Sequence, residues 1–153
     1  MGSDSIDAAK QRNLGNLLLR SARLFDALAF ERWSAGHTSI RRAHLQLMPH
    51  LDLAGTRITE LARRAEISKQ AVGQLVTDME EGGYVERVPD PSDQRAKIVV
   101  LTKRGRDAVI EGLSVFDALK SELIAELGAE VIEGLIDGLE RLSPALDALG
   151  RAR

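Results

Sequence analysis

The stretch from Arg57 to Leu101 constrains the fold of this chain more than any other segment. It contains two short helical patterns separated by a tight turn, followed directly by two runs rich in β-branched residues. The tip between those runs reads Pro89-Asp90-Pro91-Ser92-Asp93-Gln94-Arg95. A helix-turn-helix can place one helix in the major groove of DNA, and an arginine on a hairpin can enter the narrower minor groove. The two devices together predict a DNA-binding regulator.

The first helix of the pair is expected to begin at Thr59, whose hydroxyl can accept a hydrogen bond from a free backbone N–H. The turn falls at Glu66-Ile67, and Ser68 is expected to cap the second helix. Both helices carry apolar residues at helical spacing, which predicts a shared core. These residues are Ile58, Leu61, Ala62 and Ala65 in the first helix and Val72, Leu75, Val76 and Met79 in the second.

The opposite side of the second helix is polar, because a helix turns by about 100° per residue. This side carries Gln70, Gln74, Thr77 and Glu81, with Lys69 and Gly73 on its flanks. Glutamine pairs with adenine through two hydrogen bonds, and lysine contacts guanine or phosphate. On an isolated helix the same residues would indicate only a solvated face. The hairpin that follows favours a face that contacts DNA.

The hairpin is expected to follow Gly82-Gly83, since glycine takes the left-handed conformation that ends a helix. Its strands are predicted over residues 84–88 and 97–101, with Pro89 and Pro91 ending the first strand and stiffening the connection. The tip is longer than a two-residue turn, so it should project from the domain. Asp93 and Arg95 can meet through a charge-assisted hydrogen bond that directs the arginine. The alternative is an ordinary charged loop.

These residues resemble the MarR family of winged helix-turn-helix transcription regulators over roughly residues 10–148. The resemblance implies an obligate homodimer whose recognition helices enter successive major grooves, with Arg95 in the minor groove and Asp93 orienting it. It is weaker at Ala71, Gly73 and Gln74, where many members carry hydroxyl side chains or arginine. Glu66 replaces a common glycine, at a cost of about 1 kcal/mol if its φ is positive. The matching motifs are Ile58-Thr59-Glu60-Leu61-Ala62, Ser68-Lys69-Gln70, Gly83-Tyr84-Val85, the hairpin tip from Asp90 to Arg95, and Leu101-Thr102-Lys103-Arg104-Gly105.

The flanking segments carry three long apolar stripes. A helix is expected from Thr102 to about Leu127, ended by Gly128, and a second one has leucines spaced three and four apart as in a heptad seam. Ser143-Pro144 should kink or restart that second helix. A third stripe includes Leu14, Leu17, Leu18, Leu24, Phe25 and Leu28. Part of each stripe packs within the chain, but one small domain cannot cover all three, which favours a dimer interface.

The charge of the chain is unevenly distributed. The formal net charge is −2, yet residues 57–106 hold 10 basic and 8 acidic side chains, whereas residues 107–150 hold 2 and 10. The local field matters more for DNA binding than the sum. The acidic segment is therefore expected to lie away from DNA.

The absence of cysteine excludes disulfides, thiolate metal sites and the cysteine-based peroxide sensing of some family members. No apolar run reaches the ~18 residues of a membrane span, and the N-terminus lacks a signal-peptide pattern. We expect a cytoplasmic protein without membrane contact.

The segment between the first helix and the helix-turn-helix holds Trp33, His37, Arg41 and His44, followed by an expected helix over residues 45–51. In the MarR family, a pocket in this region often takes small aromatic acids or lipophilic ligands. A tryptophan wall beside arginine and histidine can hold an anionic aromatic. The alternative is that Trp33 is core and the polar residues are incidental. A metal site from His37, His44 and His50 is disfavoured by their spacing.

The sequence therefore predicts a mainly α fold with a small β-wing, forming a single domain over residues 1–153. Residues 40–101 form the winged helix-turn-helix DNA-binding region, and residues 10–35 and 102–150 form dimerisation helices. The expected function is a homodimeric transcription regulator, a repressor on an inverted-repeat operator in double-stranded DNA, released by a small aromatic or lipophilic effector. The residues expected to contact DNA are Ser68, Lys69, Gln70, Gln74, Thr77, Asp93 and Arg95.

Two other classes of protein, an enzyme and a scaffold, fit the sequence less well. An enzyme would need a nucleophile–base pair, a metal set or a phosphate loop, and none stands at a recognisable spacing. No catalytic residue, metal or cofactor is therefore expected. A non-catalytic helical dimerisation or scaffold protein, without specific DNA binding, would explain the apolar helices but not the Asp93–Arg95 wing.

Overall fold

The computed structural model describes residues 13–37 and 39–151. The chain divides into two compact units, Met1–Leu113 and Ser114–Arg153. The first unit contains a three-stranded antiparallel sheet of strand order β1-β3-β2. The elements in chain order are α2 (Leu14–Ser34), α3 (Arg42–Leu45), η1 (Met48–His50), β1 (Thr56–Arg57), α4 (Ile58–Ala65), α5 (Lys69–Glu81), β2 (Val85–Asp90), β3 (Asp93–Leu101), α6 (Lys103–Leu127) and α7 (Ala129–Arg151).

The predicted helix-turn-helix is confirmed as α4 and α5. Glu66, in the turn, has a φ of 55°, the strained left-handed value considered from the sequence. Ser68 caps α5 by accepting a hydrogen bond from the Ala71 N–H at 3.1 Å. The expected core residues Leu61, Val72, Val76 and Met79 are buried, while Leu75 is half-buried. The apolar periodicity therefore located the buried face correctly.

The start of α4 differs from the expectation. The helix begins at Ile58 rather than Thr59, and its N-cap is Arg57, with no side-chain cap hydrogen bond. The reason is strand β1, in which Thr56 and Arg57 pair with Val99 and Ile98 of β3. The chain thus passes directly from an extended strand into a helix. A two-residue strand has no periodicity that the sequence could have revealed.

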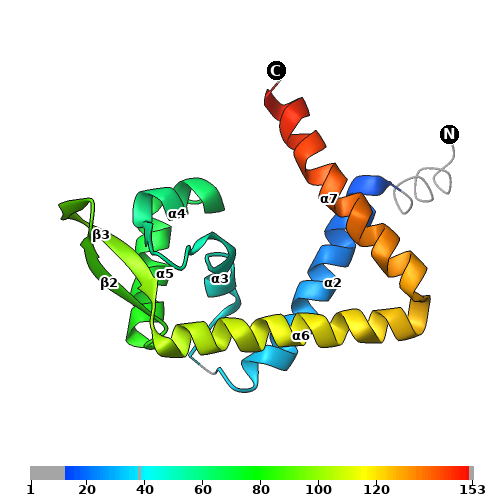
Figure 1. The fold of residues 1–153 in the computed structure, drawn as a ribbon, viewed down its shortest axis with the longest axis horizontal. Helices are drawn as coiled ribbons and strands as arrows, with labels where there is room; N and C mark the ends of the chain where they lie inside the picture. Colours follow the sequence, from blue (N-terminus) through cyan, green and yellow to red (C-terminus); the bar gives the residue numbers. More distant parts are fainter. Residues whose placement is uncertain (1–12, 38, 152–153) are drawn as a thin grey trace, which may run out of the picture. The chain divides into compact units, whose positions relative to one another are not determined.

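The wing is longer than predicted, and its turn is tighter. Strand β2 continues through Pro89 to Asp90, and only Pro91 and Ser92 separate it from β3. Proline is tolerated there because β2 is an edge strand. A register irregularity at Pro89/Asp90 takes up the residues that were expected in a longer tip. The hairpin extends beyond α4 and α5 (Figure 1).

The segment after residue 41 also departs from the expectation. The predicted helix over residues 45–51 is instead the four-residue α3 followed by the 3₁₀-helix η1. Pro49 lies within the first residues of η1, where it supplies no N–H to continue an α-helix. Leu47, between the two short helices, is fully buried and anchors them to the core.

The two C-terminal helices largely match their predicted bounds. Gly128, with a φ of 91°, separates α6 from α7. Helix α7 runs through Pro144 without a restart, so that alternative was wrong. Beside the proline, the Ser143 hydroxyl donates to the Leu139 carbonyl at 3.2 Å. None of the helices in the described ranges is long and apolar enough to cross a membrane.

Many apolar side chains of the long helices are exposed in the single chain. On α2 they include Leu14, Leu17, Leu24, Phe25 and Leu28, and on α6 and α7 they include Leu113, Phe116, Leu123, Leu127, Leu135, Leu139, Leu146 and Leu149. Leu149 is 67% exposed and Leu139 is 40% exposed. A folded chain that kept such stripes in water would carry an unusually large apolar surface.

Helix α6 begins in close contact with the residue that precedes the wing. The N–H of Thr102 donates to the Tyr84 carbonyl at 3.0 Å, and the Thr102 hydroxyl donates to the Gly83 carbonyl at 2.7 Å. Gly105 lies within the first turn of the helix, and a Cβ there would stand 1.9 Å from the Tyr84 carbonyl oxygen. Only glycine fits at this position without moving backbone.

We therefore expect Gly105→Ala to lower the free energy of unfolding by about 1–3 kcal/mol, the usual cost of overpacking. The matched control is Gly112→Ala on the same helix, where a Cβ would meet the Trp33 ring at 3.7 Å, an ordinary contact. That substitution should be neutral or stabilise by up to about 1 kcal/mol, because alanine favours the helix. Denaturant unfolding at one protein concentration measures both; equal effects would contradict the close approach.

Candidate nucleic-acid interface

Helix α5 is held by its apolar side and presents its polar side to solvent. Val72, Val76 and Met79 are buried, whereas Lys69, Gln70 and Gln74 are exposed. Three of the side chains expected to contact DNA thus lie on the free part of one helix. Ser68 stands at its N-terminus, where its oxygen accepts the capping bond and its proton stays free to donate.

Thr77, the fifth predicted contact at this helix, is half-buried, and its hydroxyl already makes hydrogen bonds within the protein. Its hydroxyl donates to the Gly73 carbonyl at 2.9 Å and accepts from the Arg87 guanidinium at 3.0 Å. Arg87, on β2, also pairs with the carboxylate of Glu80 and donates to the Gly73 carbonyl at 3.1 Å. This network fastens the first strand of the wing to α5. Thr77 therefore helps to position the wing.

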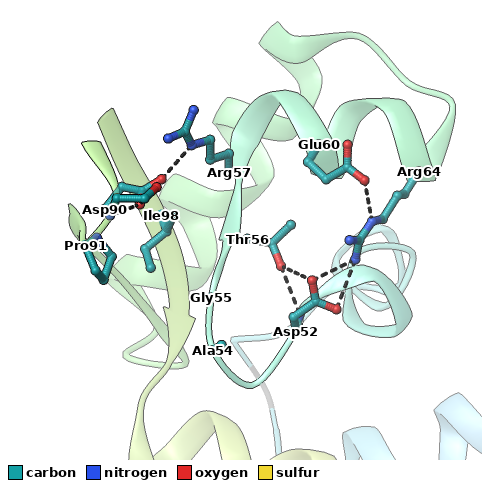
Figure 2. A pocket seen from close by; sticks show the side chains of 11 residues that line it. Asp52, Ala54, Gly55, Thr56, Arg57, Glu60, Arg64, Asp90, Pro91 and Ile98 are labelled. Atoms are coloured by element: carbon teal, nitrogen blue, oxygen red, sulfur yellow. Dashed lines mark hydrogen bonds and ion pairs between the residues drawn. The ribbon is translucent and has the colours of Figure 1, made fainter. Parts of the chain in front are cut away.

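The turn of the wing is organised by Asp90. Its Oδ1 accepts from the backbone N–H of Ser92 at 2.7 Å and from the Ser92 hydroxyl at 2.6 Å. Its Oδ2 accepts from Nε of Arg57 at 2.6 Å, and Figure 2 shows this contact from the start of α4 across to the hairpin. Aspartate commonly builds a turn by accepting from the residue two positions on.

These contacts keep Asp90 charged over a wide range of pH. The Ser92 hydroxyl, the Ser92 backbone N–H and then Arg57 lower the pKa of Asp90 from 3.8 to about 2. Because the folded-state pKa is depressed, the contribution of Asp90 to stability is present above pH 3.8 and is lost as the pH falls towards 2. The tie between α4 and the wing therefore persists throughout the neutral range.

Asp93 and Arg95 lie together, but their contact differs from the expected one. Asp93 Oδ1 accepts from the backbone N–H of Arg95 at 3.1 Å, so it fixes the backbone rather than the guanidinium. Its other oxygen lies 3.9 Å from the Arg57 guanidinium. Arg95 itself is exposed on the hairpin. The sequence did not indicate Arg57 or Asp90, although Asp90-Pro91-Ser92 is a recognisable turn signal.

A shallow hollow of about 400 Å³ lies between the tip of the wing and the start of α4. Its lining includes Arg57, Asp90, Asp52, Glu60 and Arg64 (Figure 2). Arg64 donates to Glu60 at 2.7 Å and to Asp52 at 3.0 Å. Hydrogen bonds from Arg63 and then Arg64 lower the pKa of Glu60 to about 2. The hollow is thus lined by paired ions.

The residues expected to bind a ligand separate into two clusters. In the first, the rings of Trp33 and His37 stack with centroids 4.2 Å apart, and Trp33 Nε1 donates to the Ala108 carbonyl at 3.0 Å. His37 contacts the Tyr84 hydroxyl at 3.1 Å through Nδ1 and Glu111 at 2.8 Å through Nε2. Trp33 and His37 are both buried.

The second cluster consists of Arg41 and His44, which both face Asp78 of α5. It joins the start of α3 to α5 and makes no connection to Trp33. His50, the third histidine, is half-buried, and its carbonyl accepts from Arg64 at 3.2 Å. Among residues 13–37 and 39–151, no group of three or more histidine, cysteine or acidic side chains is placed to hold a metal ion.

Residues 39–96 of the chain match the MarR family. Transcriptional activatory protein BadR of Rhodopseudomonas palustris is 40% identical over 52 residues, which are 34% of this chain and 30% of BadR. The HTH-type transcriptional regulator YdgJ of Bacillus subtilis is 29% identical over 108 residues, which are 69% of this chain and 65% of YdgJ. The chain thus spans less than two thirds of each of these relatives.

Solved structures match over most of the chain. The reduced form of MarR from E. coli has a TM-score of 0.75 at 25% identity, covering 86% of this chain and 97% of MarR. The transcriptional repressor CouR, bound to a 23-mer DNA duplex, has a TM-score of 0.67 at 20% identity, covering 88% of this chain and 95% of CouR.

The relatives carry the names of transcription regulators and not of enzymes. The mainly helical fold with its small antiparallel wing is the fold of the MarR structure. The motifs of the helix-turn-helix and the wing lie within the stretch that matches the family. Residues 39–96 are thus similar to the MarR family of transcription regulators, and the chain has the fold of the MarR structure.

Proposed function

We propose that this protein binds an inverted-repeat operator in double-stranded DNA as a homodimer and thereby regulates transcription. The observation that carries the proposal is that Lys69, Gln70 and Gln74 on α5 and Arg95 on the hairpin are all exposed, while a network through Arg87 fastens the two elements together. Such an arrangement suits one helix in the major groove and one arginine in the adjacent minor groove. The DNA-bound state of CouR supports it.

Each predicted contact residue has a distinct proposed role. Gln70 and Gln74 contact base edges, and Lys69 binds phosphate. Ser68, at the N-terminus of α5, donates its free hydroxyl proton to a phosphate, where the helix dipole favours an anion. Arg95 enters the minor groove while Asp93 shapes the backbone beneath it. Thr77 supports the wing through Arg87.

The homodimer is proposed because the stripes on α2, α6 and α7 remain exposed in the single chain. We assign residues 10–35 and 102–150 to dimerisation and residues 40–101 to DNA binding, within a single functional domain of residues 1–153. The 10 acidic side chains of residues 107–150 fit a position away from DNA. A protein acting on bacterial genomic DNA would work in the cytoplasm.

Repression, and its release by a small aromatic or lipophilic effector, remain predictions about the same protein. BadR is named an activator and CouR a repressor, so relatives of either kind exist. A ligand binding at Trp33 and His37 must replace their contacts with Ala108, Tyr84 and Glu111. A ligand at Arg41 and His44 must replace their contacts with Asp78.

A gel shift of the full chain with its own upstream DNA, at two salt concentrations, tests the proposed function. A specific complex should survive competitor DNA and the higher salt better than a complex with unrelated duplex, because phosphate contacts alone are strongly salt-sensitive. Footprinting should show two half-sites about 10–10.5 base pairs apart, centre to centre. No specific complex would instead favour the scaffold interpretation.

Arg95→Ala should weaken specific binding by about 1–3 kcal/mol, the scale of a well-made arginine contact to DNA. The substitution should leave thermal unfolding unchanged, because the side chain is exposed. Asp93→Ala should weaken binding less, since it loosens the backbone and leaves the arginine in place. Titration of the operator measures both variants. Unchanged affinity for Arg95→Ala would remove the wing from the mechanism.

Arg57→Ala should weaken operator binding through the wing, because Arg57 ties α4 to Asp90 and Asp93. If it acts by positioning, its effect should vanish when Arg95 is already alanine, giving a coupling of roughly 0.5–2 kcal/mol in the double-mutant cycle. Arg42→Ala is the matched control, since Arg42 pairs with Asp26 and is 48% exposed, against 43% for Arg57. Additive effects of Arg57 and Arg95 would indicate a direct phosphate contact instead.

Leu139→Asp should prevent formation of the homodimer, because it places a charge in the proposed seam at a cost of several kcal/mol. We expect aggregation or a poorly folded monomer that no longer binds the operator. Ala148→Asp adds the same charge to an exposed position on the opposite side of α7 and should leave the dimer intact. Sedimentation measures the oligomeric state and operator titration measures the affinity, both on the same sample. A folded monomer that binds the full operator tightly would contradict the proposed dimer.

A further inference from the structure

The side chain of Gln74 is held in one orientation on α5. Its Nε2 donates to Oδ1 of Asp78, one turn further along the helix, at 2.8 Å. A carboxylate only accepts hydrogen bonds, so the amide must turn its NH₂ group towards Asp78. This contact leaves one N–H and the Oε1 acceptor of Gln74 for another partner. The bond thus determines the order of donor and acceptor that the helix presents.

Asp78 is itself held by residues that precede α4 in the chain. The Arg41 guanidinium donates to Asp78 Oδ2, and His44 Nε2 lies 3.5 Å from the same oxygen. His44 is 1% exposed, and its Nδ1 accepts from the Arg41 backbone N–H at 2.9 Å. A neutral ring therefore carries its proton on Nε2, which faces Asp78. Asp78 is thereby fixed from the side of α3.

The charge states of this group are consistent with that geometry. Burial lowers the pKa of His44, which favours the neutral ring. Gln74, His44 and Arg41 together lower the pKa of Asp78 below 3.8, with the Gln74 hydrogen bond as the largest cause. At neutral pH a charged carboxylate therefore stands between a guanidinium and the Gln74 amide.

The chemistry of the base edges indicates what a fixed Gln74 can recognise. In the major groove adenine presents an N6 donor beside the N7 acceptor, which matches Oε1 and one N–H of glutamine. Guanine presents two acceptors, O6 and N7, and these require two donors. With one N–H bound to Asp78, Gln74 would place its own acceptor opposite an acceptor of guanine. The held amide therefore matches adenine and opposes guanine.

We propose that Asp78 is a positioning residue for base recognition, which holds Gln74 in the orientation that selects adenine at one position of each half-site. The inference rests on the proposed function, since it requires α5 to enter the major groove. Arg41 acts behind Asp78 by donating to its carboxylate, and His44 Nε2 lies 3.5 Å from the same oxygen. A carboxylate on a helix that approaches phosphates repels them. Asp78 therefore lowers the general affinity for DNA and raises the discrimination between bases.

The test compares base preference with overall affinity. Duplexes that bind the full-length protein are selected from a randomised pool, and affinities are then measured for the best duplex and its single-base substitutions. Wild type should favour adenine over the other bases by roughly 5- to 150-fold at one position per half-site, the range for a bidentate contact. Gln74→Ala should abolish the preference at that position and so identify it.

Asp78→Asn should lower the preference at the position identified by Gln74→Ala to less than about threefold, because an amide at residue 78 allows the Gln74 amide to turn over. Preferences at other positions should persist, and affinity for unrelated duplex should stay equal or rise because a negative charge is lost. Glu81→Gln is the matched control: it removes the same charge from an exposed position about one turn after Asp78 on α5 and should keep the adenine preference.

The outcomes separate this inference from the proposed function. An adenine preference that survives Asp78→Asn, or that Gln74→Ala does not change, overturns the positioning role and leaves a sequence-specific regulator. A wild-type protein without any base preference overturns both. If Asp78→Asn fails to fold by circular dichroism, Asp78→Ala decides by the same criterion, because it removes the oxygen that accepts from the Gln74 amide. That variant should relax the preference at the same position.

Discussion

The packing of the apolar side of α5 against the core is the interaction on which the rest of the candidate site depends. Val72, Val76 and Met79 are buried on one side of the helix, so a rotation that moved Gln70 or Gln74 away from solvent would also expose these residues. Burying side chains of this size stabilises by about 1.5–3 kcal/mol each. The packing therefore fixes the polar face more firmly than any contact made by the polar residues themselves.

A second layer of organisation consists of ion pairs between elements that are distant in the chain. Arg57 joins the start of α4 to Asp90 of the wing, Arg87 joins β2 to Glu80 of α5, and Arg41 joins the start of α3 to Asp78. Each pair has at least one side chain that is a third or more exposed, and pairs that reach solvent contribute little to stability, about 0–1 kcal/mol each. These ion pairs instead orient side chains. Each one holds a carboxylate or a strand beside a side chain that is proposed to contact DNA.

These ion pairs also explain why the proposed DNA-binding surface is only weakly basic. Residues 57–106 carry 10 basic and 8 acidic side chains, and Arg57, Arg63, Arg64 and Arg87 are paired with carboxylates. A paired arginine attracts phosphate less than a free one. Such a surface suits recognition by a few placed side chains better than a strong general attraction to DNA.

The sequence by itself determined the two helices of the helix-turn-helix, the turn between them, the long C-terminal helices and the presence of the wing, because these depend on residues close together in the chain. The spacing of Val72, Val76 and Met79, the cap at Ser68 and the glycine at 128 are all local signals, and the structure confirms them. The resemblance to the MarR family could be found in the sequence for the same reason, because its motifs are continuous stretches of chain. Where neighbouring residues determine the structure, the predicted bounds differ little from the observed ones. Helix α4, for example, begins one residue earlier than predicted.

Only the tertiary structure decided which distant side chains meet. Strand β1 exists because residues 56–57 lie beside β3, and Pro89 remains in a strand because that strand is at the edge of the sheet. Arg57 and Asp90 are 33 residues apart, and Arg41 and Asp78 are 37 apart. No periodicity connects such positions. Their pairing follows from the packing of the helices and strands that carry them, so the orientation of Gln74 and of the wing could not be predicted from the sequence.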